Sequence, residues 1–513
     1  MSDKQMCGFL FQYNEKDKID LKIFQNQINH LKWRGPDNQT ILFLRNNYVG
    51  MLHCRLSIID LNPRANQPMI SKNQRYVILF NGEIYNHLEI RDKLKLNCQT
   101  SSDTETILEG YAKFGKKIFN LLDGMFSIVI YDNLNNNWIA VRDAFGIKPM
   151  YIYQSYSKTI ICSETHVINN LVNSDICKYS LKEFKLLRRP IPGRTIYKNI
   201  NEVLPGTVLT SSNRSYKIWD WSKKNDCFNQ NHLEDLIKKS IQKHLISDVK
   251  VVSLLSGGID SSIITSISKI NKCYSVGLLQ NNEFKEASQI ADALNVKLKK
   301  IKVSKNKLIN SWKFLINIRN EPINLPNEGL IYNVFKSFNN DEKVALTGEG
   351  ADEIFFGYDN IFRLATKKVS INSLLKYYFY DNSKVGERLN DFVTDLAKNK
   401  TPIEFLEDFF YQHHLPTLLR RMDFASMASS KEARVPFVNK SIISYLYRMP
   451  SLLKIDEVSA KKPLRQIINK IGLSFILNTK KIGFSSKLNS NDDKILEYNR
   501  FYSYQFKVLG WEV

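Results

Sequence analysis

The chain has 513 residues, of which 43% are hydrophobic and 24% are charged. At roughly 100 to 200 residues per domain, this length predicts two to four domains, and the composition excludes a disordered chain, a collagen and a coiled coil. Lysine plus arginine exceeds aspartate plus glutamate by 73 − 51 = 22. Because the lysines are spread along the chain, we expect a solvated basic surface and no nucleic-acid partner.

The cysteine content and the apolar runs bear on the compartment. Seven cysteines are too few for a disulfide scaffold in a chain of this length. The N-terminus contains no apolar segment of signal-peptide length, and no apolar run approaches the roughly 18 residues of a membrane span. We therefore expect a cytoplasmic enzyme without a membrane partner.

The first 220 residues are expected to be rich in β-strands. Short apolar runs at 75–80, 125–131 and 138–141 are punctuated by Gly, Asn and Asp. A helix is predicted to follow Ser102 and Asp103. This pattern favours two packed sheets with flanking helices.

The pattern changes after a polar stretch at 222–231, which is the expected linker. Strand-like runs at 249–255, 274–279, 296–303 and 343–347 alternate with helical patterns at 261–269 and 284–294. Such alternation is typical of a parallel, doubly wound sheet, whose ligands bind at the carboxyl ends of the strands. From about residue 370 onward we expect mostly helix.

Two glycine turns follow strands of this expected sheet. The first is Ser256-Gly257-Gly258-Ile259-Asp260-Ser261-Ser262. Its glycines let the backbone approach a phosphate, the next helix presents free N–H groups, and Asp260 would hold Mg²⁺. The second is Thr347-Gly348-Glu349-Gly350-Ala351-Asp352-Glu353. Its three carboxylates indicate metal and proton chemistry, although each one alone is also explained as an acid that complements a helix dipole.

Cys7 is the candidate nucleophile. An N-terminal cysteine is special because its own α-amino group serves as the base for its thiol. Asn81 and the N–H of Gly82 would form an oxyanion hole, although Asn-Gly is also a turn signal. Arg55 would clamp a carboxylate, while Glu83 and Asp103 would hold an ammonium group. Together these groups suit the two ends and the amide of glutamine.

Taken together, these motifs resemble the glutamine-hydrolysing asparagine synthetase family, which joins a class II glutaminase to an ATP pyrophosphatase. The resemblance runs from Cys7 to about Phe484. Further matching stretches are Leu122-Asp123-Gly124-Met125-Phe126, Arg142-Asp143-Ala144-Phe145-Gly146-Ile147-Lys148-Pro149 and Glu432-Ala433-Arg434-Val435-Pro436-Phe437.

The resemblance implies an α+β N-terminal-nucleophile (αββα) glutaminase domain at 7–221. An α/β doubly wound synthetase domain with a helical C-terminal part would follow at 232–513. It further implies that Cys7 attacks glutamine, Glu349 assists acyl-adenylate formation and Lys461 neutralises phosphate charge. The implied glutamine-binding residues are Arg55, Leu56, Ser57, Ile58, Ile59, Asn81, Gly82, Glu83 and Asp103. The implied ATP-binding residues are Leu255, Ser256, Gly257, Gly258, Asp260, Ser261, Val276, Thr347 and Gly348. Asp260 and Asp352 would carry Mg²⁺.

The expected substrates are glutamine, ATP and a carboxylic acid, with aspartate as the leading acceptor, and a homodimer is possible. The mechanism needs Cys7 as first residue, so we expect translation from Met6 or cleavage of a propeptide, and favour the former. The sequence departs from the family pattern mainly in its second half, at Leu298-Lys299-Lys300, Asp423-Phe424 and Asn439. These departures bear on the identity of the acceptor more than on the type of reaction.

Three alternatives therefore stay open. The same chemistry would act on another carboxylate, such as a sugar acid or a natural-product precursor. A nucleic-acid-modifying protein with the same ATP loop would fit the charge, and a regulatory relative would have an inactive glutaminase. Adjacent His413 and His414 are not interpreted as metal ligands, because neighbouring side chains diverge on a helix. The aromatic tail from Tyr498 to Trp511 is expected to serve packing or an interface.

Overall fold

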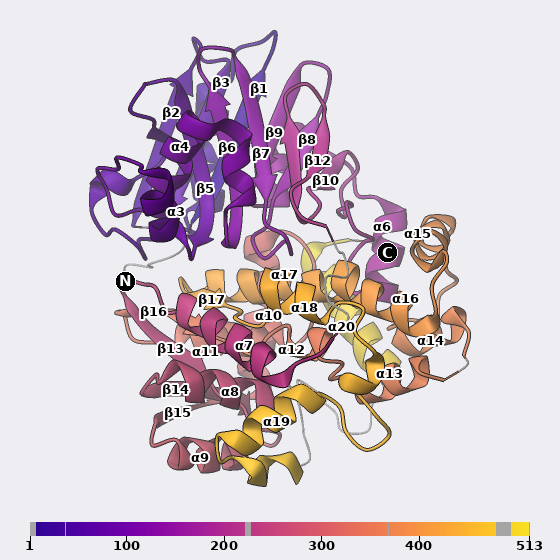
Figure 1. Cartoon of the computed structure of the whole chain (residues 1–513). Helices are drawn as coiled ribbons and strands as arrows, with labels where there is room; N and C mark the ends of the chain where they lie inside the picture. Colours follow the sequence, from indigo (N-terminus) through magenta and orange to yellow (C-terminus); the bar gives the residue numbers. More distant parts are fainter. Residues whose placement is uncertain (1–6, 36, 221–226, 368, 479–493, 512–513) are drawn as a thin grey trace.

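The computed structural model describes residues 7–35, 37–220, 227–367, 369–478 and 494–511. Figure 1 shows the strands of the N-terminal part in the upper half and most helices in the lower half. Met6, Phe484 and residues 222–226 of the expected linker lie outside the described residues. The end of that linker is helical, since α7 (Gln230–Lys243) begins inside it. The cause is a cap, in which the Asn229 side chain accepts a hydrogen bond from the His232 N–H at 3.0 Å.

Two antiparallel sheets form the described N-terminal part. The first has the order β10-β8-β9-β1-β3-β2 and the second has the order β12-β11-β7-β6-β5-β4. The strands of the first sheet are β1 (Gly8–Asn14), β2 (Asn38–Leu44), β3 (Val49–Arg55), β8 (Tyr151–Gln154), β9 (Lys158–Cys162) and β10 (Ile200–Glu202). The strands of the second are β4 (Met69–Ile70), β5 (Tyr76–Ile84), β6 (Gly124–Asp132), β7 (Asn137–Arg142), β11 (Thr207–Thr210) and β12 (Ser215–Lys217). The three predicted apolar runs correspond to β5, β6 and β7.

The sheets pack face to face, with a helical layer outside each. Phe9 and Phe11 of β1 share a buried core with Leu79 of β5 and Val129 of β6. The outer face of the first sheet packs on α1 (Leu21–Asn26), α2 (Ile28–Leu31), α5 (Thr165–Val172) and α6 (Lys178–Leu187). The second packs on α3 (His87–Leu94) and α4 (Asp103–Phe114). The αββα fold is confirmed, and α4 begins where predicted because Ser102 caps it.

The second sheet system is parallel and has the order β15-β14-β13-β16-β17. Its strands are β13 (Lys250–Leu254), β14 (Lys272–Leu278), β15 (Lys297–Val303), β16 (Glu342–Leu346) and β17 (Glu432–Arg434). The chain runs from β13 outward to β15 and then returns to the other side of β13 with β16. This reversal is the point at which doubly wound sheets bind ligands. Both glycine turns therefore start side by side, one after β13 and the other after β16.

Helices cover both faces of the parallel sheet, as the doubly wound class requires. One face packs on α7, α8 (Ile259–Ser268), α9 (Phe284–Ala293) and α19 (Lys462–Lys470), and the other on α11 (Glu328–Lys336) and α17 (Leu415–Met427). The expected helical C-terminal region is confirmed. The remaining helices are α10 (Lys305–Arg319), α12 (Ala351–Ile354), α13 (Asp359–Ala365), α14 (Ile371–Tyr378), α15 (Glu387–Ala397), α16 (Pro402–Phe409), α18 (Lys440–Leu446) and α20 (Lys494–Leu509).

Helix α6 links the two parts of the molecule. Its final residues, Leu186 and Leu187, belong to the apolar core of the C-terminal helices α13 to α16. The Tyr380 N–H donates to the Leu186 carbonyl at 3.0 Å. Figure 1 accordingly shows α6 beside the orange C-terminal helices. A segment of the N-terminal part therefore ends within the C-terminal part.

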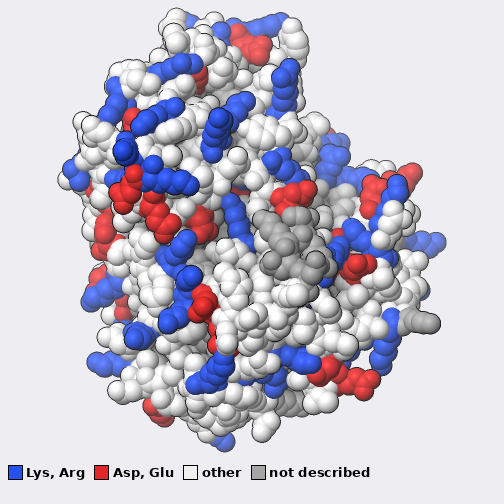
Figure 2. All heavy atoms as spheres, viewed as in Figure 1, with Lys and Arg blue, Asp and Glu red and all other residues white. Residues whose placement is uncertain are grey.

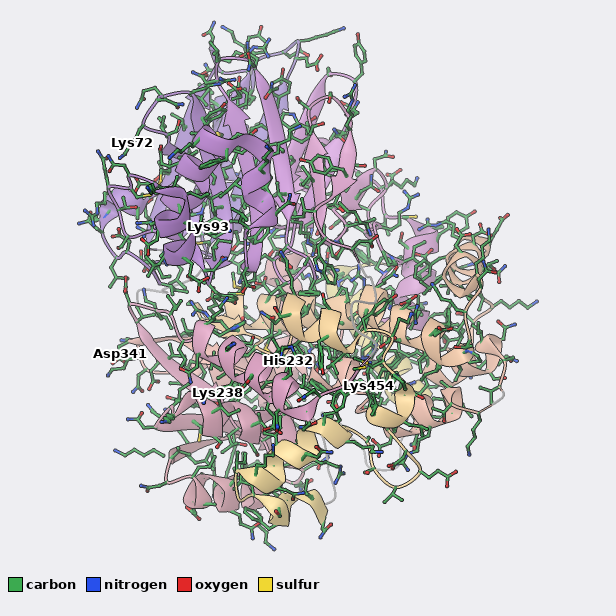
Figure 3. All side chains as sticks on the ribbon, in the orientation of Figure 1. Lys72, Lys93, His232, Lys238, Asp341 and Lys454 are labelled. Atoms are coloured by element: carbon green, nitrogen blue, oxygen red, sulfur yellow. The ribbon has the colours of Figure 1, made fainter. Side chains whose placement is uncertain are left out.

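Charge is dispersed over the surface in view. Figure 2 shows Lys and Arg interspersed with Asp and Glu on this face. In Figure 3, the labelled Lys93 and Lys238 lie on separate helices, α3 and α7, and Lys72 lies near the second sheet. The dispersion agrees with the solvated basic surface expected from the sequence, and the lack of a nucleic-acid partner stays a prediction.

Candidate active sites

Cys7 lies at the start of β1, next to the residue that follows β3. Its Sγ accepts a hydrogen bond from the Leu56 N–H at 3.4 Å and lies 3.6 Å from the Leu56 carbonyl oxygen. The Arg34 Nε donates to the Cys7 carbonyl at 3.1 Å, which fixes the backbone of the nucleophile. Burial raises the pKa of the Cys7 thiol to about 11. The thiol therefore needs a base at neutral pH, as the N-terminal amine mechanism supplies.

The candidate glutamine residues form one pocket with Cys7. Its enclosed volume is about 40 Å³. The expected residues that line it are Cys7, Arg55, Leu56, Ile58, Ile59, Asn81, Gly82, Glu83 and Asp103. Ser57 is not among the lining residues, and its N–H donates to the Asp37 carboxylate at 2.9 Å.

Asn81 and Gly82 have the properties of an oxyanion hole. Asn81 is buried and lines the pocket, and its Nδ2 is a buried donor that makes no protein hydrogen bond. A buried amide donor of this kind is costly unless a ligand satisfies it. A side chain at Gly82 would place its Cβ 2.0 Å from the Met125 carbonyl oxygen, so only glycine permits this approach of β5 to β6.

The charged groups of the pocket are already engaged with protein. The Asp103 carboxylate accepts from the Ile84 N–H at 2.9 Å, and burial raises its pKa to about 6. Arg55 donates to the Asn62 carbonyl at 3.1 Å and the Asn66 Oδ1 at 2.8 Å, so it organises the loop over the pocket. Its role as a substrate clamp stays a prediction.

Glu432 is a pocket residue that sequence reasoning did not assign. It lies on β17 of the parallel sheet, yet it lines the same pocket as Cys7. Glu432 also accepts from Arg434 Nε at 2.7 Å, and Arg434 Nη2 donates to Glu83 at 3.0 Å. No local sequence pattern predicts this contact, because it joins residues from the two parts of the chain.

A buried ionic network extends from this pocket along the interface of the two parts. Lys148 lies 3.8 Å from Glu432 and 3.1 Å from Asp423. Arg34, which holds the Cys7 carbonyl, donates to Asp423 at 2.9 Å and also pairs with Glu164. Truncating one member of such a network leaves a buried charge without compensation. The glutamine pocket is thus fixed by residues of both parts.

A second, larger cavity of about 560 Å³ opens at the reversal point of the parallel sheet. The expected residues that line it are Leu255, Ser256, Asp260, Ser261, Val276, Thr347, Gly348, Glu349 and Asp352. Gly257 and Gly258 belong to the same loop but do not line the cavity. A volume of this size is typical of small-molecule sites.

Two serines connect the ends of the loop between β13 and α8 by hydrogen bonds. Ser261 Oγ accepts from the Ser256 N–H at 3.1 Å and lies 3.0 Å from Ser256 Oγ. The helix begins at Ile259 with Gly258 as its cap, so its first N–H groups face the loop. A Cβ on Gly348 would lie 2.8 Å from the Asp260 Cβ, so a glycine is needed where the two turns meet.

Asp260 and Asp352 converge on Lys461. Lys461 Nζ lies 2.6 Å from Asp260 Oδ2 and 2.6 Å from Asp352 Oδ1. Carboxylate oxygens that share one cation are the donor set that Mg²⁺ prefers, with water and phosphate completing its shell. The two residues therefore fit the expected cation, although no group of three or more His, Cys, Asp or Glu with metal-site geometry occurs in the described part of the chain.

Two further carboxylates stand beside this cluster. Glu349 pairs with Arg421, and burial raises the Glu349 pKa. Glu353 accepts from the Tyr358 hydroxyl at 2.6 Å, and burial with the neighbouring Asp352 charge raises its pKa to about 7. Arg421, Tyr358 and Glu283 line the cavity but were not expected from the sequence, since their positions depend on packing.

Family comparison agrees with this two-site architecture. The glutamine amidotransferase domain family matches residues 6–222, and the asparagine synthase family matches residues 232–501. The chain belongs to the asparagine synthase family and carries a glutamine amidotransferase domain.

Relatives resemble the chain over most of its length. Asparagine synthetase (glutamine-hydrolyzing) 1 of Bacillus subtilis is 29% identical, covering 93% of this chain and 87% of its own. Asparagine synthetase B (glutamine-hydrolyzing) of Escherichia coli is 27% identical, covering 75% and 71%. Among solved structures, the glutamine phosphoribosylpyrophosphate amidotransferase of B. subtilis, complexed with ADP and GMP, shows 15% identity and a TM-score of 0.33, covering 57% of this chain and 65% of that one.

No helix in the described part of the chain is long and apolar enough to cross a membrane.

Proposed function

We propose that the protein makes an amide from glutamine, ATP and a carboxylic acid, and that aspartate is the leading acceptor. The observation that carries the proposal is the pairing, in one chain, of a thiol pocket with an unsatisfied amide donor and a cavity built on a phosphate-type loop. The asparagine synthetase names of the relatives support the same reaction.

In the first site, the Cys7 thiolate attacks the side-chain amide carbon of glutamine. The oxyanion accepts hydrogen bonds from the Asn81 amide, whose donor has no protein partner, and from the Gly82 N–H. Ammonia leaves, and water then hydrolyses the thioester to glutamate and restores the thiol. The α-amino group of a mature Cys7 accepts the thiol proton, so the chain must be processed to this residue.

In the second site, the acceptor carboxylate attacks the α-phosphorus of ATP and releases pyrophosphate. The serines and helix N–H groups after β13 bind the phosphates, and Lys461 neutralises their developing charge. Ammonia from the first site then displaces AMP from the acyl-adenylate, with Glu349 positioned to accept the proton. When bound, Mg²⁺ at Asp260 and Asp352 would neutralise phosphate charge.

We also propose the boundaries 7–221 for the glutaminase domain and 232–513 for the synthetase domain. The strand composition of the two parts and the family matches at 6–222 and 232–501 support these bounds. A reducing, cytoplasmic setting is proposed because all seven cysteines are free thiols. The homodimer stays a prediction.

The test begins with protein whose mature first residue has been verified by intact mass. Protein that starts at Cys7 is incubated with glutamine, ATP, Mg²⁺ and aspartate, and asparagine and AMP are quantified together. Asparagine in step with AMP supports the proposal with aspartate as acceptor. Glutamate formation without AMP would support the glutaminase assignment and would exclude aspartate as the acceptor. Pyrophosphate release that requires tRNA would instead favour a nucleic-acid-modifying enzyme.

A further inference from the structure

Arg188 is a buried arginine that no step of the proposed reaction uses. It follows α6 as the helix cap, with a left-handed backbone φ of 71°, and its carbonyl accepts from Asn324 Nδ2 at 2.7 Å. Only 3% of the residue is exposed, yet it lines the 560 Å³ cavity. A guanidinium group from the N-terminal part therefore lies at the cavity of the C-terminal part.

The charge of this guanidinium is not compensated by protein. Its Nη2 donates to the Tyr378 hydroxyl and to His414 Nδ1, both at 2.8 Å, and its Nε has no partner. The Tyr380 ring centroid lies 4.2 Å away. Within the described residues Arg188 makes no ion pair. A buried cation among neutral groups carries a desolvation cost that an anionic ligand would offset.

The neighbouring arginine, Arg189, is a buried cation whose charge is compensated by protein. Arg189 is equally buried, but it pairs with Glu202, which also pairs with Arg142 at 3.0 Å. Two consecutive arginines therefore have opposite environments. One is neutralised inside the N-terminal part, and the other faces the cavity without a carboxylate.

The position of Arg188 relative to the reaction centre follows from a chain of contacts. His414 separates it from Glu353, because the ring presents Nδ1 to Arg188 and places Nε2 3.3 Å from Glu353. Glu353 is next to Asp352, which shares Lys461 with the phosphate loop. His414, Glu353 and Asp352 thus separate Arg188 from Lys461 and the phosphate loop.

The surroundings of Arg188 are aromatic and cationic. Tyr380 and Tyr498, which also line the cavity, have ring centroids 4.5 Å apart. Lys494 Nζ lies 3.8 Å from the Tyr380 centroid, and burial together with the Arg188 charge lowers the pKa of Lys494 to about 7, so this lysine contributes only part of a positive charge at neutral pH. Three of the acids that line the cavity are bound to cations, Asp260 and Asp352 to Lys461 and Glu349 to Arg421, while Glu283 accepts from the Gly257 N–H at 3.3 Å.

We propose that Arg188 binds a second anionic group of the acceptor, so that this site selects carboxylic acids that carry another carboxylate or a phosphate-like group. The inference rests on the proposed amide synthesis and names its acceptor class. It favours aspartate-like molecules over sugar acids with a single carboxylate. Bidentate geometry suits a guanidinium to either kind of anion.

Binding is tested first, because it does not depend on turnover. Thermal shifts of the full chain are measured with succinate, with its monoamide succinamate and with 3-phosphonopropanoate. We expect succinate or 3-phosphonopropanoate to raise the Tm of the wild type more than succinamate does. The larger of these two Tm shifts identifies whether Arg188 prefers a carboxylate or a phosphonate. Equal shifts for all three would overturn the proposal.

The matched variants are Arg188→Gln and Arg194→Gln, since Arg194 is an exposed arginine of the same segment. Arg188→Gln should remove the preference for the dianions, Arg188→Lys should restore part of it, and Arg194→Gln should not change it. Without ligand, Arg188→Gln should be at least as thermally stable as the wild type. A lower unliganded Tm with an unchanged preference would assign Arg188 a structural role and refute the inference.

Turnover separates the inference from the proposed function. With ammonia as nitrogen donor, aspartate is compared with isoasparagine, in which only the β-carboxylate is free, and AMP is measured. Arg188→Gln should raise the aspartate KM about 10- to 100-fold, the size expected for a lost charge-assisted hydrogen bond, and leave the ATP KM and glutaminase activity unchanged. A changed ATP KM with an unchanged aspartate KM would place Arg188 at the nucleotide and overturn the inference. If the dianions bind in a manner that depends on Arg188 but no acceptor yields AMP, the proposed function is refuted while the inference about Arg188 stands.

Discussion

Arg434→Gln is the perturbation for which the structure makes the most specific prediction. The Arg434 side chain is fully buried and donates to Glu432 at 2.7 Å and to Glu83 at 3.0 Å. It also donates to the carbonyls of His244 at 2.8 Å and Ile246 at 2.6 Å. One side chain therefore compensates two carboxylates and two backbone acceptors at the junction of the two parts. Glutamine keeps a polar group but removes the charge.

The expected loss of stability follows from the fate of the carboxylates. Removing one partner of a buried ion pair costs about 3–5 kcal/mol, because the remaining charge is left uncompensated. At about 2–4 °C per kcal/mol for a unit of 150–250 residues, this corresponds to a Tm decrease of about 6–20 °C.

The loss should depend on pH with a defined sign. Burial already raises the pKa of Glu83, while Arg434 opposes that rise. Without the arginine, the folded-state pKa of Glu83 should rise further above its unfolded value. A carboxyl of this kind has no effect on stability below its unfolded pKa. Its destabilising effect grows as the pH rises from the unfolded to the folded pKa and is constant above the folded pKa. The Tm decrease should therefore be larger at pH 8 than at pH 5.

The assay is the midpoint of the first thermal transition at both pH values, since a chain of this size does not unfold in one step. Arg75→Gln is the control, because Arg75 pairs with Asp132 at 2.7 Å but lies at the surface. Its Tm change should be far smaller. A decrease for Arg434→Gln no larger than that of the control, or equal decreases at the two pH values, would refute the assignment of an essential buried network.

Three further predictions address the two sites. Cys7→Ala should abolish asparagine formation from glutamine but leave formation from ammonia, and the loss of both activities would contradict the two-site proposal. Asp260→Asn should abolish pyrophosphate release while glutaminase activity, measured as glutamate, survives; unchanged pyrophosphate release would rule out the ATP-site assignment. Burial and the neighbouring Asp352 charge raise the pKa of Glu353 to about 7, so Glu353 lowers stability as the pH rises from the ordinary range of a glutamate to about 7, and the loss is constant above that pH. Glu353→Gln should therefore raise the Tm at pH 8 and change it little at pH 4.5, and a lower Tm at pH 8 would show that the ionised carboxylate is stabilising.

Local sequence signals located the elements that depend on local physics. Ser102 caps α4 where predicted, and the apolar runs at 125–131 and 138–141 became β6 and β7. The loop from Ser256 to Ser262 lies between β13 and α8 as expected. Errors of one or two residues at element ends, such as the start of α7 within the expected linker, reflect caps whose strength depends on neighbours.

Two residues lie differently from what their sequence neighbours indicate. Ser57 was placed with its neighbours in the glutamine pocket, but its N–H bonds to Asp37 and it does not line the pocket. Tyr498 was interpreted as packing or interface, yet it also lines the ATP cavity. Neither the sequence neighbours of Ser57 nor the aromatic character of Tyr498 predicts which cavity the residue lines, because that depends on the path of the backbone.

The sequence by itself determined the class of each half and the short motifs of both sites, because periodicity, glycine turns and caps act over a few residues. Only the tertiary structure decided which distant groups complete those sites. Glu432 reaches the Cys7 pocket from another sheet, Lys461 bridges Asp260 and Asp352, and Arg188 enters the second cavity from the N-terminal part. Such contacts depend on how whole layers pack and on where buried charges find partners, and no local pattern of residues encodes that packing.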